Sequence, residues 1–273
     1  MYYAHTFLPN KNKKNKNFLI YQTFSFLFLK KQNLKINLYA GEDYLNICKD
    51  IGLNYDNFIE IHKNEYQENY WSHSKMQALK LNNDIIIDHD LFLLKDVSNY
   101  INNQDLIYSH KESVEAHGWY KSDPLLAFKK TVPKNKILEW DYLIDSFYDN
   151  NDSIKEAADL NYAFNCCIIG FKDKQIAMDY ANKSLTLFEY LNKNNANIST
   201  LKDNHFLPTI AEQLFLSFYS KYHNLETFNF SNNTSNSNYI HVGSEKYKYH
   251  KDILKSIKVN APNIYQNLLK YIV

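Results

Sequence analysis

The chain of 273 residues contains no arginine, and its 31 basic residues are all lysines. A cationic side chain that contacts a phosphate must therefore be a point-like ammonium group and not a two-pronged guanidinium. Glycine is also scarce, with 5 residues, and the chain has neither a glycine-rich phosphate loop nor a Gly-x-Ser-x-Gly nucleophile motif. Any chemistry on phosphate groups is thus left to lysines, backbone amides and a metal ion.

Cysteine is limited to Cys48, Cys166 and Cys167, an odd number without Cys-x-x-Cys spacing. This excludes a disulfide framework and a cysteine-based zinc site, and it predicts buried, reduced thiols, which suits a cytoplasmic location. Adjacent residues of a strand point to opposite faces, so Cys166 and Cys167 should enter different sides of a sheet. The net charge of +1 gives no general attraction to nucleic acid or an anionic membrane.

The N-terminal region imitates a signal peptide, because the basic residues 11–16 precede the mostly apolar residues 18–29. Gln22, Thr23 and Ser25 interrupt the apolar run, and no small-x-small cleavage site follows it. The run is also too short to span a bilayer. The sequence therefore predicts a buried helix here and no transmembrane segment.

Strand and helix patterns alternate at short spacing through the first 110 residues, which predicts a parallel sheet built from right-handed βαβ units. Strands are expected at residues 2–8, 35–40, 58–62, 84–90, 105–109, 163–171 and 239–242. Helices are expected at residues 18–31, 42–51, 70–81, 135–148, 173–191 and 208–222, and in the lysine- and tyrosine-rich tail. With 45% hydrophobic residues, no internal repeat and no clear linker, the chain is predicted to be one α/β domain, 1–273.

The most informative stretch is Ile85-Ile86-Ile87-Asp88-His89-Asp90. A continuous apolar run predicts a strand buried on both faces, and it ends in two carboxylates that favour a cation. Since residues i and i+2 of a strand point the same way, Asp88 and Asp90 are expected to face one ion, with His89 turned to the other side. Two hard oxygen ligands suit Mg²⁺ or Mn²⁺. The alternative is an Asp-rich turn in which Asp90 caps the next element.

This stretch resembles the Asp-x-Asp motif of GT-A-fold glycosyltransferases, which depend on nucleotide sugars. His241, Gly243 and Lys246 resemble the C-terminal motif of their glycogenin-like family 8. That resemblance implies a third metal ligand at His241, close backbone approach at Gly243 and a diphosphate contact at Lys246. The family has one more residue between His and Gly, and Pro-Trp after Lys where this chain has Tyr-Lys. The alternative is a strand, a turn and a surface lysine.

Two further segments resemble the sugar-binding side of these enzymes. Asn165 matches an Asn-x-Gly strand whose Asn helps to hold the sugar, although Cys167 replaces the glycine. Glu212 and Gln213 match an Asp-Gln pair at a helix start beside the transferred sugar. The alternatives are a core strand in which Asn165 bonds to backbone and a solvated Glu212.

The nucleotide contacts implied by the resemblance are positional. Lys75 lies one helix before Asp88, where many GT-A enzymes have a basic residue, and a solvated lysine is the alternative. His5 and Thr6 end the first strand, where nucleobase and ribose contacts are expected. His89 is also expected among the nucleotide-binding residues.

The resemblance implies a GT-A-like, Rossmann-type mixed and mainly parallel sheet flanked by helices. It further implies a metal-dependent enzyme that moves a sugar from a nucleoside diphosphate sugar, UDP-sugar favoured, to a glycan, a glycolipid or another hydroxyl acceptor. Residues 1–110 would form the nucleotide-sugar half, and residues 111–273 the acceptor half with a closing C-terminal segment. We expect no nucleic-acid partner and allow for peripheral contact with a membrane.

Two alternatives stay open. A nucleotidyltransferase on a related sheet would need a glycine-rich loop after the first strand, which Leu8-Pro9-Asn10-Lys11 does not provide. A catalytically silent protein that binds a nucleotide sugar, or serves as a scaffold, could share the same fold. Hydrolysis of a UDP-sugar by the purified protein would distinguish this last alternative from an enzyme.

Overall fold

The structure is a computed structural model, and it describes residues 1–8, 16–62, 72–113, 132–148, 162–193, 209–230, 238–243 and 246–272. Parts of some predicted features lie outside the described residues: residues 11–15 of the basic segment, residues 70–71 of the expected helix 70–81 and residue 208 of the expected helix 208–222. Within the described part, no helix is both long and apolar enough to cross a bilayer.

A seven-stranded sheet lies at the centre of the fold. Its strands are β1 (Tyr3–Phe7), β2 (Ile36–Ala40), β3 (Asn57–Glu60), β4 (Ile85–Ile87), β6 (Leu106–Ser113), β7 (Tyr162–Phe171) and β8 (Thr227–Asn229). Their order is β3-β2-β1-β4-β7-β6-β8. The first four strands in this order are parallel, β7 is antiparallel to β4 and β6, and β8 is parallel to β6. The predicted fold class, a mixed and mainly parallel sheet flanked by helices, is confirmed.

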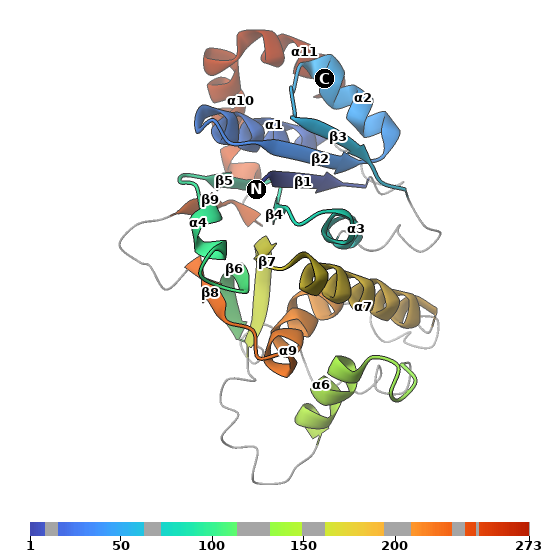
Figure 1. Cartoon of the computed structure of the whole chain (residues 1–273). Helices are drawn as coiled ribbons and strands as arrows, with labels where there is room; N and C mark the ends of the chain where they lie inside the picture. The colour runs from blue at the N-terminus through green and yellow to red at the C-terminus, as the bar shows by residue number, and fades with distance from the viewer. Residues whose placement is uncertain are drawn as a thin grey trace.

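Helices cover both faces of this sheet (Figure 1). One core cluster draws on α1 (Lys16–Lys31), α2 (Glu42–Ile51), α10 (Lys246–Asn260) and α11 (Pro262–Ile272). The other draws on α3 (His73–Leu81), α6 (Leu138–Tyr148), α7 (Lys174–Lys193), the π-helical turn η6 (Ile210–Leu214) and α9 (Phe215–Tyr222). The predicted buried N-terminal helix is confirmed as α1. A short helix, α4 (Ser98–Ile101), precedes β6.

Neighbouring residues of the buried strands belong to different cores. Ile85 packs with the α1 side and Ile86 with the α3 side. Cys166 and Cys167 divide in the same way, and all three cysteines are buried free thiols, as predicted. The alternation of side chains along a strand explains why a continuous apolar run is needed in a sheet covered on both faces.

The predicted strand over residues 84–90 is wrong in its extent. β4 ends at Ile87, and a tight turn follows in which the Leu91 amide donates to the Asp88 carbonyl at 3.1 Å. The chain then forms β5 (Leu91–Leu93), which pairs antiparallel with β9 (Tyr239–His241) in a separate two-stranded sheet. A turn thus replaces the strand end that the apolar run predicted, and it directs the chain away from the main sheet.

Candidate active site

The site lies at the point between β1 and β4 where the strand order of the sheet reverses. The chain builds β1, β2 and β3 toward one edge and then places β4 on the opposite side of β1. In open α/β sheets, ligands bind beyond the carboxyl ends of the strands at such a switch point. Thr6 stands near the end of β1 and Asp88 directly follows β4. The Ser74 hydroxyl donates to Thr6 Oγ1 at 3.1 Å, which ties the start of α3 to β1.

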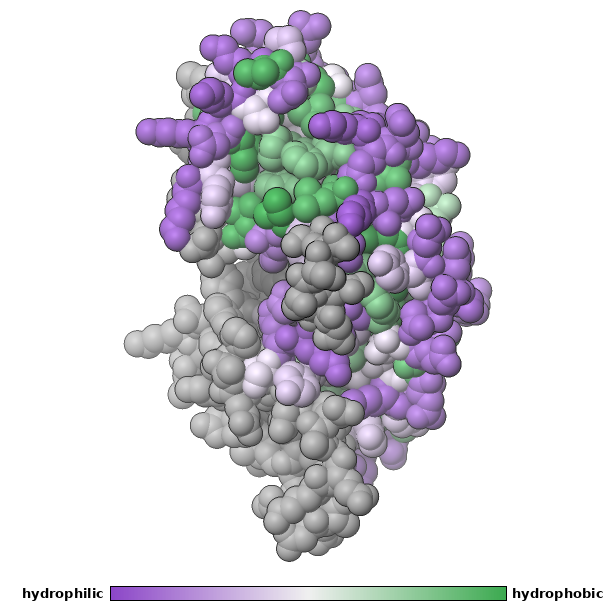
Figure 2. All heavy atoms as spheres, turned by 90° about the vertical axis from the view of Figure 1, so that its left-hand side faces the viewer, coloured by the Kyte–Doolittle hydropathy of each residue, from purple (hydrophilic) through white to green (hydrophobic). Residues whose placement is uncertain are grey.

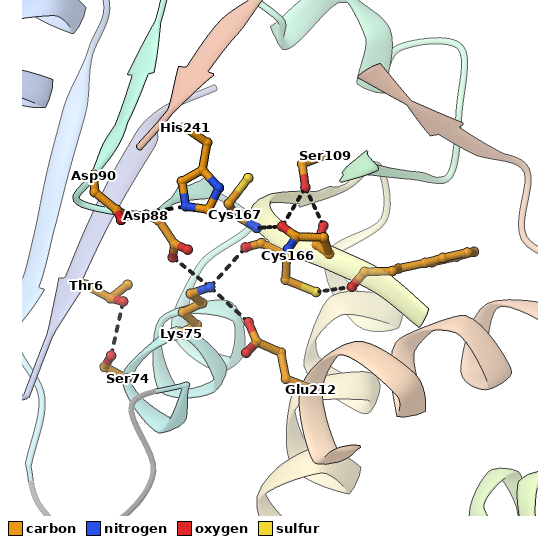
Figure 3. Close-up of polar contacts among 12 residues, drawn as sticks. Thr6, Ser74, Lys75, Asp88, Asp90, Ser109, Cys166, Cys167, Glu212 and His241 are labelled. Carbon is orange, nitrogen blue, oxygen red and sulfur yellow. Dashed lines mark hydrogen bonds and ion pairs between the residues drawn. The ribbon is translucent and has the colours of Figure 1, made fainter. Parts of the chain in front are cut away.

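Asp88, Asp90 and His241 converge at this place (Figure 3). One ligand atom from each side chain lies within 4.8 Å of the others. Backbone contacts hold all three: the Asp88 amide donates to the Cys167 carbonyl at 2.9 Å, and the Val242 amide donates to the Asp90 carbonyl at 3.2 Å. Because Leu91 pairs with His241 across β5 and β9, the C-terminal strand delivers the imidazole to the turn that holds both carboxylates.

The electrostatics of this cluster favour a cation. Burial lowers the pKa of the His241 imidazole, but Asp90 and the Cys167 thiol outweigh burial and raise it to about 11. The His241 Nε2 atom lies 3.6 Å from Asp90 Oδ1. Two carboxylates and the imidazole, which must release a proton to bind a metal, form a donor set that fits Mn²⁺ or Mg²⁺, with softer nitrogen ligation favouring Mn²⁺. The residues present therefore fit the divalent ion that the sequence predicts.

Lys75 stands beside this cluster and is only 4% exposed. Its ammonium nitrogen lies 2.7 Å from Asp88 Oδ1 and 3.0 Å from Glu212 Oε1, and it donates to the Cys166 carbonyl at 2.9 Å. Burial lowers the pKa of Lys75, yet Asp88 and Glu212 outweigh burial and raise it, so the group stays charged. The alternative of a solvated lysine is thus excluded, and Lys75 links the turn after β4 to β7 and η6.

Glu212 is fully buried in the π-helical turn η6. Its carboxylate forms an ion pair with Lys75, whose nitrogen lies 3.0 Å from Oε1. Burial raises the pKa of Glu212 to about 7, with Lys75 opposing this rise and Asp88 adding to it. Single π-helical turns occur often at functional sites. A solvated Glu212, the plain alternative from the sequence, is therefore wrong.

Asn165 belongs to a polar network on β6 and β7. The Ser109 hydroxyl contacts both the carbonyl and the side-chain oxygen of Asn165 at 2.7 Å, and Asn165 Nδ2 donates to Glu112 Oε1 at 2.6 Å. The Cys167 amide donates to Asn165 Oδ1 at 3.0 Å, which links this network to the residue that holds Asp88. Sequence reasoning missed Ser109 and Glu112, and β-strand alternation from the predicted strand at 105–109 could have suggested only Ser109.

His5 is not placed for the predicted nucleobase contact. Its ring is completely buried, with Nδ1 2.9 Å from the Tyr55 hydroxyl and Nε2 3.0 Å from the Ser25 hydroxyl. Burial lowers its pKa to about 3, so the ring is neutral. A neutral ring with both nitrogens matched inside a core is a structural histidine, and the prediction for His5 is corrected accordingly.

The remaining predicted residues are His89, Gln213, Gly243 and Lys246, and each has its own surroundings. The His89 ring stacks on Phe18 with centroids 3.5 Å apart. Gln213 is buried beside Glu212 in η6. Gly243 adopts a left-handed φ of +52°, a conformation that strains other residues. Lys246 begins α10, but its side chain lies outside the described part of the structure.

A surface hollow of about 500 Å³ lies elsewhere, between β3, α3 and α7. His62, His73 and Lys80 are among its lining residues, and none of the predicted site residues lines it. The chemistry of the carboxylates, imidazole and ammonium group therefore locates the candidate site better than the shape of this hollow does.

No protein-family profile matches the chain, and no curated protein matches it. Among the solved structures that resemble it are two glycosyltransferases of low sequence identity. The galactosyltransferase LgtC, in complex with donor and acceptor sugar analogues, is 9% identical, with a TM-score of 0.40 over 77% of this chain and 70% of LgtC. The bifunctional glycosyltransferase WbbM is 13% identical, with a TM-score of 0.48 over 99% of this chain and 51% of WbbM. This chain thus spans about half the length of WbbM.

Proposed function

We propose that the protein is a metal-dependent glycosyltransferase that takes its sugar from a nucleoside diphosphate sugar, with UDP-sugar as the favoured donor. The observation that carries this proposal is the convergence of Asp88, Asp90 and His241 at the switch point of the sheet. The acceptor is a hydroxyl group of a glycan or glycolipid. The order of the matching motifs along the chain adds support from the sequence.

The chemistry follows from charge. Transfer of a glycosyl group leaves a nucleoside diphosphate, which gains negative charge as the glycosidic bond breaks. A divalent ion held by Asp88, Asp90 and His241 would supply the Lewis acidity that neutralises this charge. Gly243, at its left-handed φ, allows the backbone of the tail to turn toward the same place. Lys246 at the start of α10 is proposed as a diphosphate contact.

Lys75 is assigned a positioning role. Its ammonium group already has three oxygen atoms within 3.0 Å, from Asp88, Glu212 and Cys166. It therefore fixes the orientation of Asp88 and holds η6 against β7. Glu212 acts through Lys75, because a fully buried carboxylate presents no surface to an acceptor hydroxyl. Asn165 and Gln213 remain the proposed contacts with the transferred sugar.

The test is ligand-dependent stabilisation of the purified chain. UDP with Mn²⁺ should raise the melting temperature, and UDP alone should raise it much less. A ligand that binds only the folded state at 100 times its Kd adds about 2.7 kcal/mol to the free energy of unfolding. GDP and CMP with Mn²⁺ serve as matched controls.

Stabilisation by GDP or CMP but not by UDP would overturn the donor assignment. Stabilisation by UDP that is independent of metal would overturn the metal site. Slow, Mn²⁺-dependent hydrolysis of a UDP-sugar then distinguishes an enzyme from a silent nucleotide-sugar-binding protein. Release of inorganic pyrophosphate from a nucleoside triphosphate and a sugar phosphate would instead indicate a nucleotidyltransferase.

A further inference from the structure

The outer side of α1 carries apolar side chains that the core does not fully cover. Phe24, Leu27 and Phe28 follow the i, i+3, i+4 spacing of one helix face, and all three are partly exposed. Lys31 continues this face and is exposed. A helix on the surface of a water-soluble domain normally places polar residues at these positions.

The two-stranded sheet of β5 and β9 extends this apolar surface. Phe92 pairs with Ile240 across the strands, and its buried ring lies 4.8 Å from Phe24 and 5.8 Å from Phe28, measured between centroids. Ile240 is 50% exposed and Leu94 is 37% exposed. Phe24, Leu27, Phe28, Leu94 and Ile240 together are called the apolar patch. In Figure 2, hydrophobic residues gather on this face with hydrophilic residues around them.

Helix α10 packs on α1 and is strongly basic. The Tyr21 and His250 rings meet edge to face between the two helices. Ile253 and Ile257 are buried, whereas the opposite side of α10 exposes four lysines at helical spacing: Lys248, Lys251, Lys255 and Lys258. These four residues are called the lysine stripe.

The charge of the chain is unevenly distributed. Residues 246–272 contain six lysines and one aspartate, which gives +5, and since the whole chain carries +1, the remainder carries −4. The low net charge therefore conceals a basic C-terminal segment. Its field is directed at whatever approaches α10, within about a Debye length of 8 to 10 Å.

We propose that the apolar patch and the lysine stripe dock the protein on the surface of an anionic lipid bilayer. Partly exposed aromatic and aliphatic side chains enter the boundary between headgroups and acyl chains, and lysines attract anionic headgroups. Neither feature alone specifies this partner, but an apolar area beside a basic helix matches both properties of such a surface. Ile240 precedes His241 on β9, so docking holds the candidate site close to the bilayer.

The test is flotation of the purified full chain with lipid vesicles. One set of vesicles is made of phosphatidylcholine alone, and the other contains about 30% phosphatidylglycerol, which gives a moderately negative surface. The protein should float with the anionic vesicles and much less with the neutral ones, and high salt should release it. The double variant Lys251→Glu/Lys255→Glu should reduce partitioning by at least about 25-fold, because each lysine near such a surface contributes roughly fivefold. Ile240→Ser should reduce it about tenfold through lost apolar burial.

Matched controls lie at the other end of the molecule. Lys134→Glu/Lys136→Glu makes the same change in net charge at two exposed lysines before α6, and Leu138→Ser replaces a similarly exposed side chain. Both controls should bind anionic vesicles as the parent does. Melting temperatures identify any variant that is destabilised. If Ile240→Ser is destabilised, Leu94→Ser replaces it as the variant of the apolar patch.

Three results would overturn the proposal. The parent chain could fail to float with either vesicle. The Lys134/Lys136 control could lose binding as strongly as the α10 variant, which would reduce the effect to overall charge. The parent could be a dimer by light scattering that Ile240→Ser dissociates, which would make the apolar patch an interface between copies of this chain. None of these readouts depends on transferase activity.

Discussion

Replacement of Glu212 by glutamine should change how stability depends on pH. Glu212 is completely buried, and burial raises its pKa from 4.5 to about 7 even though Lys75 lies 3.0 Å away. The folded state therefore binds a proton that the unfolded state has released at intermediate pH. Glutamine keeps the shape of the side chain but cannot titrate.

The sign and magnitude follow from proton linkage. Between pH 4.5 and 7 the folded protein holds more protons at Glu212, so the free energy of unfolding falls as pH rises through this window. A displacement of about 2.5 pH units corresponds to about 3 kcal/mol. The glutamine variant does not show this decrease in the free energy of unfolding. The difference in the free energy of unfolding, variant minus parent, should therefore be about 3 kcal/mol larger at pH 8 than at pH 4.5.

The assay is urea unfolding at several pH values between 4.5 and 8, in the presence of EDTA so that no metal binding intervenes. Glu42→Gln, at an exposed position in the first turn of α2, controls for the chemical change itself. Parallel stability curves for Glu212→Gln and the parent would refute the reasoning. They would mean that Lys75 fully compensates for burial and that Glu212 is ionised in the folded protein throughout this range.

Two further predictions concern the candidate site. Asp90→Asn should abolish Mn²⁺-dependent activity and leave the fold intact, because a neutral isostere keeps the shape but loses the charge; unchanged turnover with Mn²⁺ would remove Asp90 from the metal site. Lys246→Ala should weaken UDP–Mn²⁺ affinity by about 1–3 kcal/mol, the range for a charge-assisted hydrogen bond, without changing stability. Equal affinity in a titration would make Lys246 a surface lysine.

The central sheet could be predicted because its signal is local. Each βαβ unit has an apolar run followed by a helical pattern, and the runs at β1, β2 and β4 are buried on both faces as expected. β8 was missed, since a strand of three residues has too little pattern to be recognised. The proposed division into a nucleotide-sugar half and an acceptor half stays a prediction.

Asp88 and Asp90 do lie close together, but on a different local structure from the one that the sequence predicted. Strand alternation suggested that both side chains face one ion, but they lie on a turn between β4 and β5. The turn depends on the pairing of Leu91 with His241, a residue 150 positions away. Local pattern could not supply that pairing, and only the resemblance of the C-terminal motif connected His241 to the carboxylates.

For His5, the ligand contact suggested by the sequence is not supported by its packing. A polar residue near the end of a parallel strand suggests a ligand contact, and its two neighbours along the strand give no reason to doubt this. Its burial is decided by Ser25 on α1 and Tyr55 before β3, whose hydroxyls meet its two ring nitrogens. Such a match is a property of packing, which is invisible in the spacing of residues along the chain.

The absence of arginine has a definite consequence at Lys75. An ammonium group presents three donors from one nitrogen, whereas a guanidinium spreads five donors over a planar fork. Acceptors from the turn after β4, from η6 and from β7 all lie within 3.0 Å of the single nitrogen of Lys75, so they are arranged around a point. The single nitrogen of a lysine thus suits the geometry that holds Asp88 in place, and the same three contacts explain why Lys75 is buried and not solvated.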